Sequence, residues 1–122
     1  MEQGDKLSRL KVLVVEDEPL VAMALEHMLA DSGCAVIGPA SSLKQGLRLI
    51  HEEAVDGAVL DVNLCGEMVF PLADALAGQG VPFVYVTGYG KLLRDSNHGR
   101  PVLQKPYSKD QLLNIVATWR PR

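Results

Sequence analysis

Five short apolar runs alternate with longer amphipathic stretches along the 122 residues of this chain. The runs are unbroken rather than alternating with polar residues, which is typical of parallel strands in a sheet covered on both faces. They are Leu10–Val15, Ala35–Gly38, Gly57–Leu60, Phe83–Val86 and Val102–Gln104. Because strand–helix–strand connections are right-handed almost without exception, the connecting helices must divide between the two faces. The pattern therefore predicts an α/β architecture.

Apolar residues at helical spacing follow the first three strands and the last one. The stripes are Val21, Leu25, Met28 and Leu29; Leu43, Leu47 and Ile50; Met68, Leu72, Ala75 and Leu76; and Leu112, Ile115, Val116 and Trp119. Pro19 suits the first turn of a helix, and Ser41 or Ser42 and Ser108 suit N-cap positions. The expected fold is a doubly wound, flavodoxin-like sheet of five parallel strands in the order 2-1-3-4-5.

One connection departs from this alternation. The stretch from Gly88 to Arg100 contains three glycines and no apolar stripe. Glycine weakens a helix, and without a stripe the segment has no face to bury. We therefore expect the fourth helix to be weak or disordered.

Composition excludes several classes of protein. Hydrophobic residues make up 48% of the chain and the net charge is −3, with no run of Lys or Arg. A nucleic-acid-binding or anionic-membrane-binding protein needs a basic face, so neither function is expected. The apolar runs are far shorter than a membrane span, and the first residues lack the apolar core of a signal peptide. We expect one domain over residues 10–122, a flexible tail over 1–9, a cytoplasmic location, and reduced thiols at Cys34 and Cys65.

Polar groups follow four of the five predicted strands. Glu16 and Asp17 come after the first strand, Asp61 after the third, Thr87 after the fourth and Lys105 after the fifth. Because the carboxyl ends of parallel strands meet at one edge of a sheet, these side chains should converge there. Convergent carboxylates repel one another, and a hard, oxygen-preferring cation such as Mg²⁺ relieves that repulsion.

The same edge suits phosphoryl transfer. A carboxylate can act as the nucleophile and form an acyl phosphate, while catalysis consists mainly of positioning and charge neutralisation. Mg²⁺ would neutralise one phosphoryl oxygen and the Lys105 ammonium a second. The Thr87 hydroxyl, with nearby backbone N–H groups, would hydrogen-bond the third.

This set of residues resembles the receiver domains of two-component response regulators. The resemblance runs from about Leu10 to Trp119 and rests on Glu16-Asp17, on Asp61 in Val59-Leu60-Asp61-Val62-Asn63, on Thr87 and on Lys105-Pro106. It implies that Asp61 is the phosphoacceptor and that Mg²⁺ is bound by Asp17, Asp61 and the backbone carbonyl of Asn63, with Glu16 acting through water. Lys105 would pair with the phosphoryl group, Thr87 would couple its presence to a loop shift, and the Lys105-Pro106 peptide would be cis. A receiver of this kind catalyses only its own phosphorylation and hydrolysis, so it is not classed as an enzyme.

The chain departs from the common receiver pattern around the fourth and fifth strands. Val102 occupies the position, three residues before the lysine, where an aromatic switch residue is usual. Glycine directly follows Thr87, and Thr87-Gly88-Tyr89 resembles a subclass of bacterial receivers that often stand alone and pair with stress- or light-sensing histidine kinases. We expect phosphorylation to order the Gly88–Arg100 segment instead, and Tyr89, together with the Asn63 side chain, to shield the acyl phosphate from water.

Other classes of function fit less well. Phosphatases of the haloacid dehalogenase type also form an aspartyl phosphate, but an aspartate follows their nucleophile two residues on, where this chain has Asn63. A dinucleotide or P-loop nucleotide binder would need glycine motifs that do not occur here. A receiver that binds partners without phosphorylation, or one excised from a larger regulator or hybrid kinase, remains open.

The expected partners are proteins. The resemblance implies a histidine kinase or a histidine phosphotransfer protein as donor. It would dock around the first helix, where we expect Glu26 and His27 to be exposed, and around the loop after the fifth strand. A downstream protein target is possible, with the chain as a monomer or a weak dimer. We expect neither nucleic acid nor a membrane as a direct partner, and His27, His51 and His98 lack metal-ligand spacing.

Overall fold

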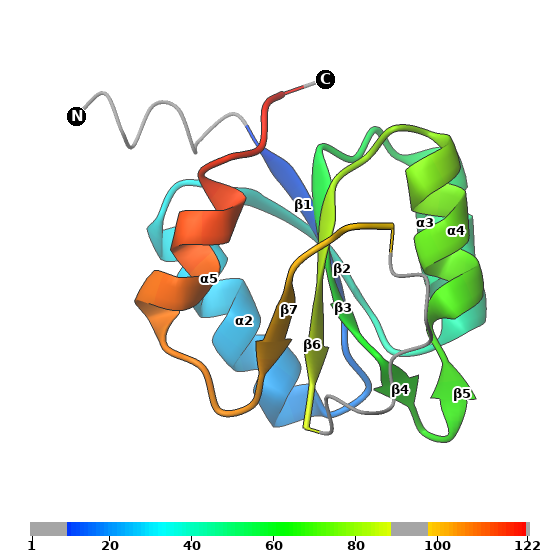
Figure 1. The fold of residues 1–122 in the computed structure, drawn as a ribbon, viewed down its shortest axis with the longest axis horizontal. Coiled ribbons are helices and arrows are strands. Elements are labelled where there is room, and N and C mark those ends of the chain that lie inside the picture. Colours follow the sequence, from blue (N-terminus) through cyan, green and yellow to red (C-terminus); the bar gives the residue numbers. More distant parts are fainter. Residues whose placement is uncertain (1–9, 89–97, 122) are drawn as a thin grey trace.

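The computed structural model describes residues 10–88 and 98–121. Its main sheet has five parallel strands in the order β2-β1-β3-β6-β7, which is the predicted order in the labels of Figure 1. The strands are β1 (Lys11–Val15), β2 (Ala35–Ala40), β3 (Gly57–Asp61), β6 (Phe83–Thr87) and β7 (Val102–Gln104). The flavodoxin-like fold predicted from the sequence is confirmed.

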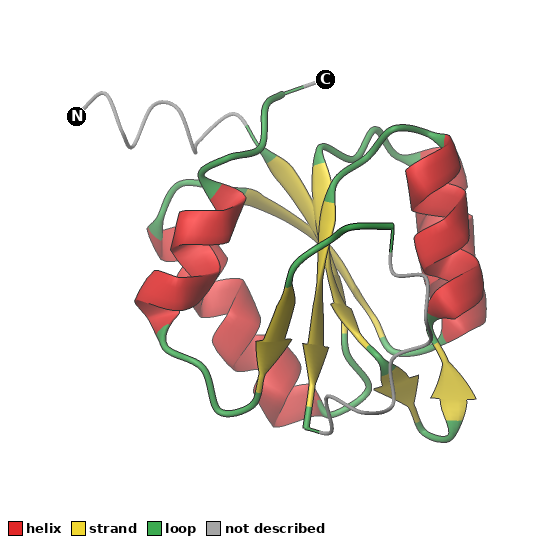
Figure 2. Ribbon diagram, in the orientation of Figure 1, coloured by secondary structure: helices red, strands yellow, loops and turns green. Residues whose placement is uncertain are grey.

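Helices cover both faces of this sheet. They are α2 (Pro19–Asp31), α3 (Leu43–Glu52), α4 (Phe70–Gly78) and α5 (Lys109–Val116). In Figure 1, α2 and α5 pack on one face and α3 and α4 on the other, and Figure 2 shows the same layers by secondary structure. Right-handed connections on a 2-1-3-4-5 sheet place α2 on one face and α3 and α4 on the other. The arrowheads of the parallel strands all point to the same edge.

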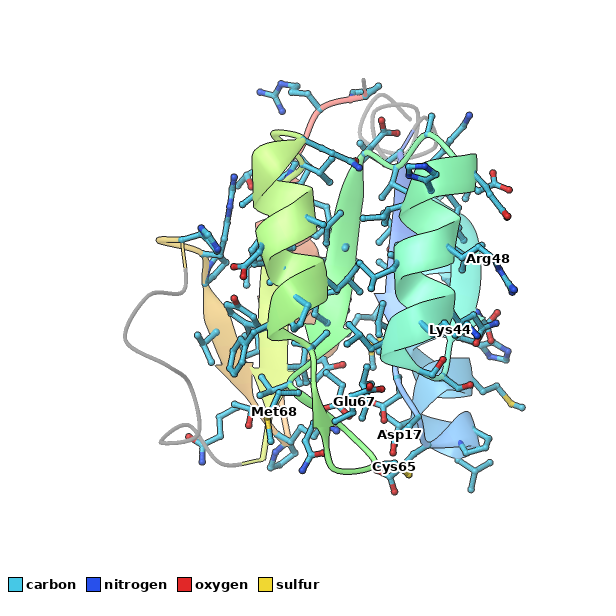
Figure 3. All side chains as sticks on the ribbon, turned by 90° about the vertical axis from the view of Figure 1, so that its right-hand side faces the viewer. Asp17, Lys44, Arg48, Cys65, Glu67 and Met68 are labelled. Carbon is cyan, nitrogen blue, oxygen red and sulfur yellow. The ribbon has the colours of Figure 1, made fainter. Side chains whose placement is uncertain are left out.

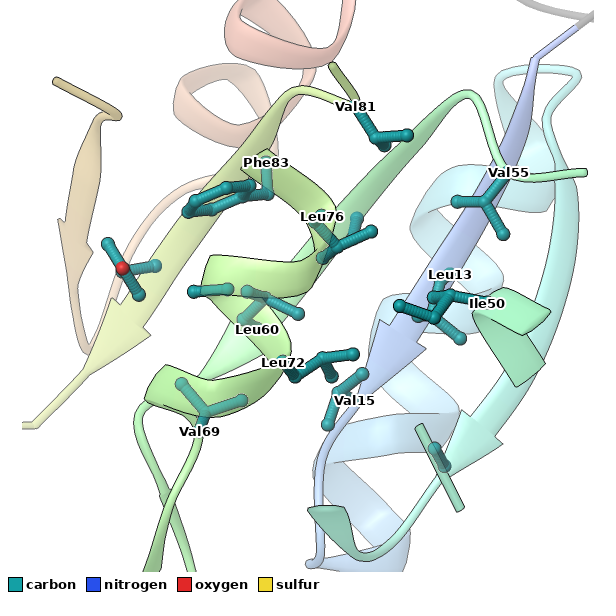
Figure 4. Packing of buried hydrophobic residues seen from close by; sticks show 14 of the residues in the cluster. Leu13, Val15, Ile50, Val55, Leu60, Val69, Leu72, Leu76, Val81 and Phe83 are labelled. Atoms are coloured by element: carbon teal, nitrogen blue, oxygen red, sulfur yellow. The ribbon is translucent and has the colours of Figure 1, made fainter. Parts of the chain in front are cut away.

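The core consists of two apolar clusters, one on each side of the sheet. One lies under α3 and α4 and includes Leu13, Leu60, Leu72 and Phe83, several of which are shown in Figure 4. The other lies under α2 and α5 and includes Val12, Leu29 and Leu112. Successive residues of one strand thus contribute to opposite clusters, which explains why the strands read as unbroken apolar runs.

The capping residues and the first-turn proline predicted from the sequence occupy the expected positions at the helix ends. The Ser42 hydroxyl accepts a hydrogen bond from the Gln45 N–H at 3.1 Å, and Ser108 forms a reciprocal capping box with Gln111. Pro19 occupies the first turn of α2, and Gly33 follows that helix with φ of +97°. The two serine caps accept backbone N–H groups that have no partner within their helices, and Pro19 has no N–H that would need one.

Three local features differ from the sequence-based expectation. Pro39 does not end β2: the strand continues to Ala40, which pairs with Val15, and the Gly38-Pro39 peptide is cis. Met68 belongs to a small antiparallel hairpin of β4 (Asn63–Leu64) and β5 (Glu67–Met68), and α4 begins after it. Trp119 is buried as expected but lies beyond the end of α5.

Two predictions concern segments that the structure does not describe. The expected flexible tail covers residues 1–9, and most of the expected weak fourth helix covers residues 89–97, which include Tyr89. Both predictions lie outside the described residues. Within 10–88 and 98–121, no helix has the length and apolar character needed to cross a membrane.

Candidate functional site

Three carboxylates meet at the carboxyl edge of the sheet. Glu16 and Asp17 follow β1, Asp61 ends β3, and one carboxylate oxygen from each lies within 4.8 Å of the others. β1 and β3 are neighbours, with Val15 paired to Leu60, so the two strand ends bring these residues to the same point. The convergence predicted from strand order is therefore present.

Lys105 provides the positive charge of the site. Its ammonium nitrogen lies 3.4 Å from Oε1 of Glu16 and 3.8 Å from Oδ1 of Asp61. The Lys105 backbone N–H also donates to the carbonyl oxygen of Thr87 at 2.8 Å, which continues the β6–β7 pairing beyond the strand ends. The Lys105-Pro106 peptide is cis, as the family resemblance implied.

Glu16 is the most deeply buried of the three acids. Its side chain is only 1% exposed, whereas the Lys105 side chain is 28% exposed. Oε2 of Glu16 accepts a hydrogen bond from the Glu18 N–H at 3.1 Å, at the N-terminus of α2. Since no side chain caps this helix at Glu18 itself, Glu16 fulfils part of that role and is held in one orientation.

The electrostatics of the cluster make Asp61 easy to protonate. Burial, followed by the negative charge of Glu16, raises the pKa of Asp61 from 3.8 to about 7, although Lys105 acts in the opposite direction. The Asp61 residue is 7% exposed, which agrees with a dominant desolvation effect. A nearby cation would lower this pKa by favouring the charged carboxylate.

Asp17 behaves differently because it is hydrogen-bonded. Burial acts to raise its pKa, but hydrogen bonds from the Cys65 thiol, from its own backbone N–H and from the neighbouring acids outweigh burial and lower it. Figure 3 labels Asp17 and Cys65 together at this edge. From the sequence, Cys65 is expected only to be a reduced thiol. Its contact with Asp17 depends on the hairpin after Asp61, which the sequence analysis did not anticipate.

The β4–β5 hairpin forms one wall of the site. Its turn places Cys65 at φ of +56° and Gly66 at φ of +90°. The side-chain oxygen of Asn63 accepts a hydrogen bond from the Gly66 N–H at 2.6 Å. The Asn63 side chain is therefore engaged in the turn of the hairpin.

Thr87 and Gly88 close the opposite wall. Thr87 is 3% exposed at the end of β6. A pocket of about 290 Å³ lies between the walls and is lined by Asp17, Glu18, Asp61, Asn63, Cys65, Gly66, Thr87, Gly88 and Lys105. Pro106 and Tyr107 follow Lys105 in the sequence. Burial, together with the negative charges of Glu16 and Asp61, raises the pKa of the Tyr107 hydroxyl to about 12.

The missing aromatic on β7 is matched by an aromatic on the neighbouring strand. Val102 is half-buried and pairs with Tyr85 of β6. Tyr85 is fully buried, and its ring contacts Phe83 and Phe70 edge-to-face, with centroids 5.3 and 6.1 Å away. Val102 thus lies next to a buried cluster of aromatic rings.

The donor set fits a magnesium ion. Mg²⁺ prefers a few carboxylate and carbonyl oxygens and keeps several waters in an octahedral shell. Asp17 and Asp61 line the pocket together with Asn63, and Glu16 lies behind them beside Lys105. The carboxylates of Glu16, Asp17 and Asp61 repel one another, and a bound cation would relieve this repulsion. The pocket of about 290 Å³ is large enough to hold water molecules and a phosphoryl group beside the cation.

Comparison with known proteins identifies the family. Residues 12–117 match the model of the response regulator receiver domain, so the chain belongs to this family of two-component signalling modules. Receiver domains are typically signalling modules rather than catalysts.

Individual relatives agree with this assignment. The solution structure of SdrG from Sphingomonas melonis Fr1 is 38% identical, has a TM-score of 0.80, and covers 90% of this chain and 95% of that chain. The BeF3-activated conformation of SdrG from Pseudomonas melonis Fr1 is 37% identical with a TM-score of 0.75, and covers 91% of this chain and 94% of that chain.

The chain is also similar to part of a longer protein. The phyllosphere-induced regulator PhyR of Methylorubrum extorquens is 26% identical over 112 residues, which are 88% of this chain and 42% of PhyR. The chain thus spans less than half the length of this curated relative.

Proposed function

We propose that the protein is a phosphoacceptor, in which Asp61 receives a phosphoryl group from a histidine kinase or a histidine phosphotransfer protein. One observation carries the proposal: three carboxylates converge within 4.8 Å, and the Lys105 ammonium lies 3.8 Å from Asp61. This is the charge pattern that an acyl-phosphate site with a divalent cation requires. The protein then signals by contact with other proteins and acts catalytically only on its own phosphorylation state.

The roles of the residues follow from their positions. A carboxylate oxygen of Asp61 attacks phosphorus and forms the new P–O bond, while the bond from phosphorus to the donor nitrogen breaks and its electron pair returns to the imidazole. Lys105 neutralises one phosphoryl oxygen, and the Thr87 hydroxyl donates to another and senses its presence. Attack requires the ionised carboxylate, so the raised pKa of Asp61 makes a bound cation important for the reaction.

The chain's own oxygens would hold that cation. Asp17, Asp61 and the Asn63 backbone carbonyl would contact Mg²⁺ directly, and Glu16 would act through water. When bound, Mg²⁺ neutralises charge on the transferring phosphoryl group and on the carboxylates. Glu16, fixed by the Glu18 N–H, keeps Lys105 at the site whether or not a phosphoryl group is present.

The donor protein needs a docking surface next to this site. At the start of α2, Leu20 is 79% exposed and Met23 is 50% exposed. Large apolar side chains on the surface beside a reaction site favour contact with an apolar partner face. We propose that these two residues, close in sequence to Glu16 and Asp17, contact a helical kinase or phosphotransfer module.

The test has two stages. Purified protein is incubated with acetyl phosphate and Mg²⁺, and mass spectrometry follows the gain of one phosphate, with Asp61→Asn as the control. Candidate kinases and phosphotransfer proteins are then mixed with the protein, and phosphoryl transfer is measured. We expect modification of the wild type, none in Asp61→Asn, and none when EDTA removes Mg²⁺.

The possible outcomes distinguish this function from the two alternatives left open by the sequence. A wild-type chain that takes no phosphate from acetyl phosphate or from any kinase, yet binds a partner unchanged in Asp61→Asn, would be a phosphorylation-independent interaction module. A chain that is modified at Asp61 only as part of a longer polypeptide would be a receiver acting within a larger regulator, as the partial coverage of PhyR allows.

A further inference from the structure

A second pocket lies at the opposite edge of the sheet from the carboxylates. It has a volume of about 420 Å³ and is lined by Gly80, Pro82, Arg100, Thr118, Trp119, Arg120 and Pro121. Pro82 precedes β6, and the 118–121 segment follows α5, so the pocket is formed where strands begin rather than where they end (Figure 1). Its size lies within the range of roughly 300–1,000 Å³ that is usual for small-molecule sites.

Arg100 is the most informative residue of this pocket. Its guanidinium carbon lies 5.6 Å from the centre of the Phe83 ring, and its Nε is buried without a hydrogen-bond acceptor among the described residues. A guanidinium carries five donors and nearly always finds a carboxylate, a carbonyl or a phosphate when it is withdrawn from water. An anion placed at the outer nitrogens of Arg100 would offset the cost of burying this charge.

The charge of the pocket is entirely positive. Arg120 supplies a second guanidinium, whose Nη1 donates to the Trp119 carbonyl at 3.3 Å. No Asp or Glu is among the described residues that line the pocket, although the chain as a whole carries a net charge of −3. Among the described lining residues, the two arginines are therefore the only charged groups, on a protein that is acidic as a whole.

The rest of the wall is mostly apolar, with Thr118 as its one other polar side chain among the described lining residues. Trp119 is 4% exposed, and its ring packs directly against the backbone of Gly57 at the start of β3. Pro82 and Pro121 have fixed φ angles and border the same space. A wall of this kind favours a ligand with an organic part beside its anionic group.

We propose that this pocket binds the dianionic phosphate group of a small phosphate ester, with Arg100 and Arg120 as its anion-binding side chains. Arginine forks match phosphate oxygens in pairs, and two positive charges suit a dianion better than a carboxylate. The site does not involve Asp61, so it stands or falls independently of the phosphoacceptor function.

The experiment uses the single tryptophan of the chain, which lines the pocket. Inorganic phosphate and phenyl phosphate are titrated into the full chain without Mg²⁺, at constant ionic strength, and Trp119 fluorescence and amide chemical shifts are followed. We expect saturable binding of both, tighter binding of phenyl phosphate, and shifts centred on Arg100 and residues 118–121. Acetate, as a monoanion, should bind at least ten-fold more weakly.

Variants connect the binding to the two arginines. Arg100→Gln and Arg120→Gln should each weaken phosphate binding at least ten-fold, and Arg100→Lys, which keeps the charge over Phe83 but loses the fork, should weaken it less. Arg48→Gln is the matched control, because Arg48 is an exposed arginine on α3 (Figure 3). Since Arg120 is exposed, its variant tests the site even if the Arg100 variants are unstable.

Any of four results would overturn the proposal. The first is a linear, unsaturable response to phosphate. The second is equal binding by Arg48→Gln, Arg120→Gln and the wild type. The third is a set of shifts confined to Lys105 and its neighbours, which would place the anion at the carboxylate edge instead. Binding of inorganic phosphate alone, with no gain from phenyl phosphate, would exclude an ester as the ligand.

Discussion

The Lys105 ammonium lies between two carboxylates, 3.4 Å from Glu16 and 3.8 Å from Asp61. The shorter contact is to Glu16, whose side chain is almost fully buried and which also accepts the Glu18 N–H. Lys105 is therefore held at the site by an acid other than the proposed phosphoacceptor. The contact with Glu16 keeps the Lys105 ammonium close to the Asp61 carboxylate.

Replacing Glu16 should change the titration of Asp61. In Glu16→Gln, the side chain keeps an acceptor for the Glu18 N–H but loses the negative charge that raises the Asp61 pKa. We expect the pKa of Asp61 to fall from about 7 toward its ordinary value, measured by carboxyl carbon NMR without divalent metal. Asp110→Asn, which removes an exposed acid at the start of α5, should leave it unchanged. An unaltered Asp61 pKa in Glu16→Gln would contradict this electrostatic account.

Stability without metal should fall as the pH rises from 4 to 7. The folded-state pKa of Asp61 is raised, so between its unfolded value of 3.8 and about 7 the folded state binds more protons than the unfolded state. The free energy of unfolding therefore decreases through this window, by about 4 kcal/mol at most from this one group. Urea denaturation at pH 5 and pH 8 in EDTA measures the decrease, and Asp61→Asn should reduce it and be more stable than the wild type at pH 8. A steeper decrease in Asp61→Asn would be inconsistent with this assignment.

Magnesium should stabilise the folded protein through the same carboxylates. A ligand that binds only the folded state at a hundred times its Kd adds about 2.7 kcal/mol, which thermal denaturation detects as a rise in Tm. We expect this rise in the wild type and little or none in Asp17→Asn. Asp31→Asn, at an exposed position at the end of α2, should respond like the wild type. Equal responses of Asp17→Asn and the wild type would exclude Asp17 as a ligand.

Gly57 should not tolerate a side chain. A Cβ at this position would overlap the Trp119 ring, which is itself buried, so the ring or the strand would have to shift. Gly57→Ala is expected to destabilise the protein by roughly 1–3 kcal/mol in urea denaturation, as overpacking does elsewhere. Gly78→Ala is the matched control, since a Cβ there meets nothing within 4 Å, and it should be neutral or slightly stabilising. Similar effects of the two variants would rule out the steric explanation.

Leu20 and Met23 should matter for the donor protein and not for the chemistry at Asp61. Leu20→Ser and Met23→Ser should slow phosphoryl transfer from a cognate kinase at least ten-fold, because exposed apolar anchors carry much of an interface. Phosphorylation by acetyl phosphate should stay at the wild-type rate, which shows that the site is intact. His51→Ala, on the exposed side of α3, should leave both rates unchanged. Kinase transfer at the wild-type rate in both serine variants would remove α2 from the interface.

The sequence predicted most of this site because strand order and strand ends determine it. Unbroken apolar runs indicated a parallel sheet, and a parallel sheet brings Asp17, Asp61 and Lys105 to one edge whatever the details of packing. The caps at Ser42 and Ser108 were likewise local signals. These inferences depend only on the spacing of apolar residues and on the order of the strands, and both can be read directly from the sequence.

Other features depended on contacts between residues far apart in the sequence. The pairing of Lys105 with Glu16 spans 89 positions, and the opposition of Val102 to Tyr85 follows from the β6–β7 register. No periodicity encodes the β4–β5 turn that brings Cys65 to Asp17, nor the packing that surrounds Arg100 with Phe83 and Trp119. The sequence by itself determined the sheet, its order and the edge that carries the acids. Only the tertiary structure decided which charges are buried, because desolvation depends on all the atoms packed around a group and not on its neighbours in the chain.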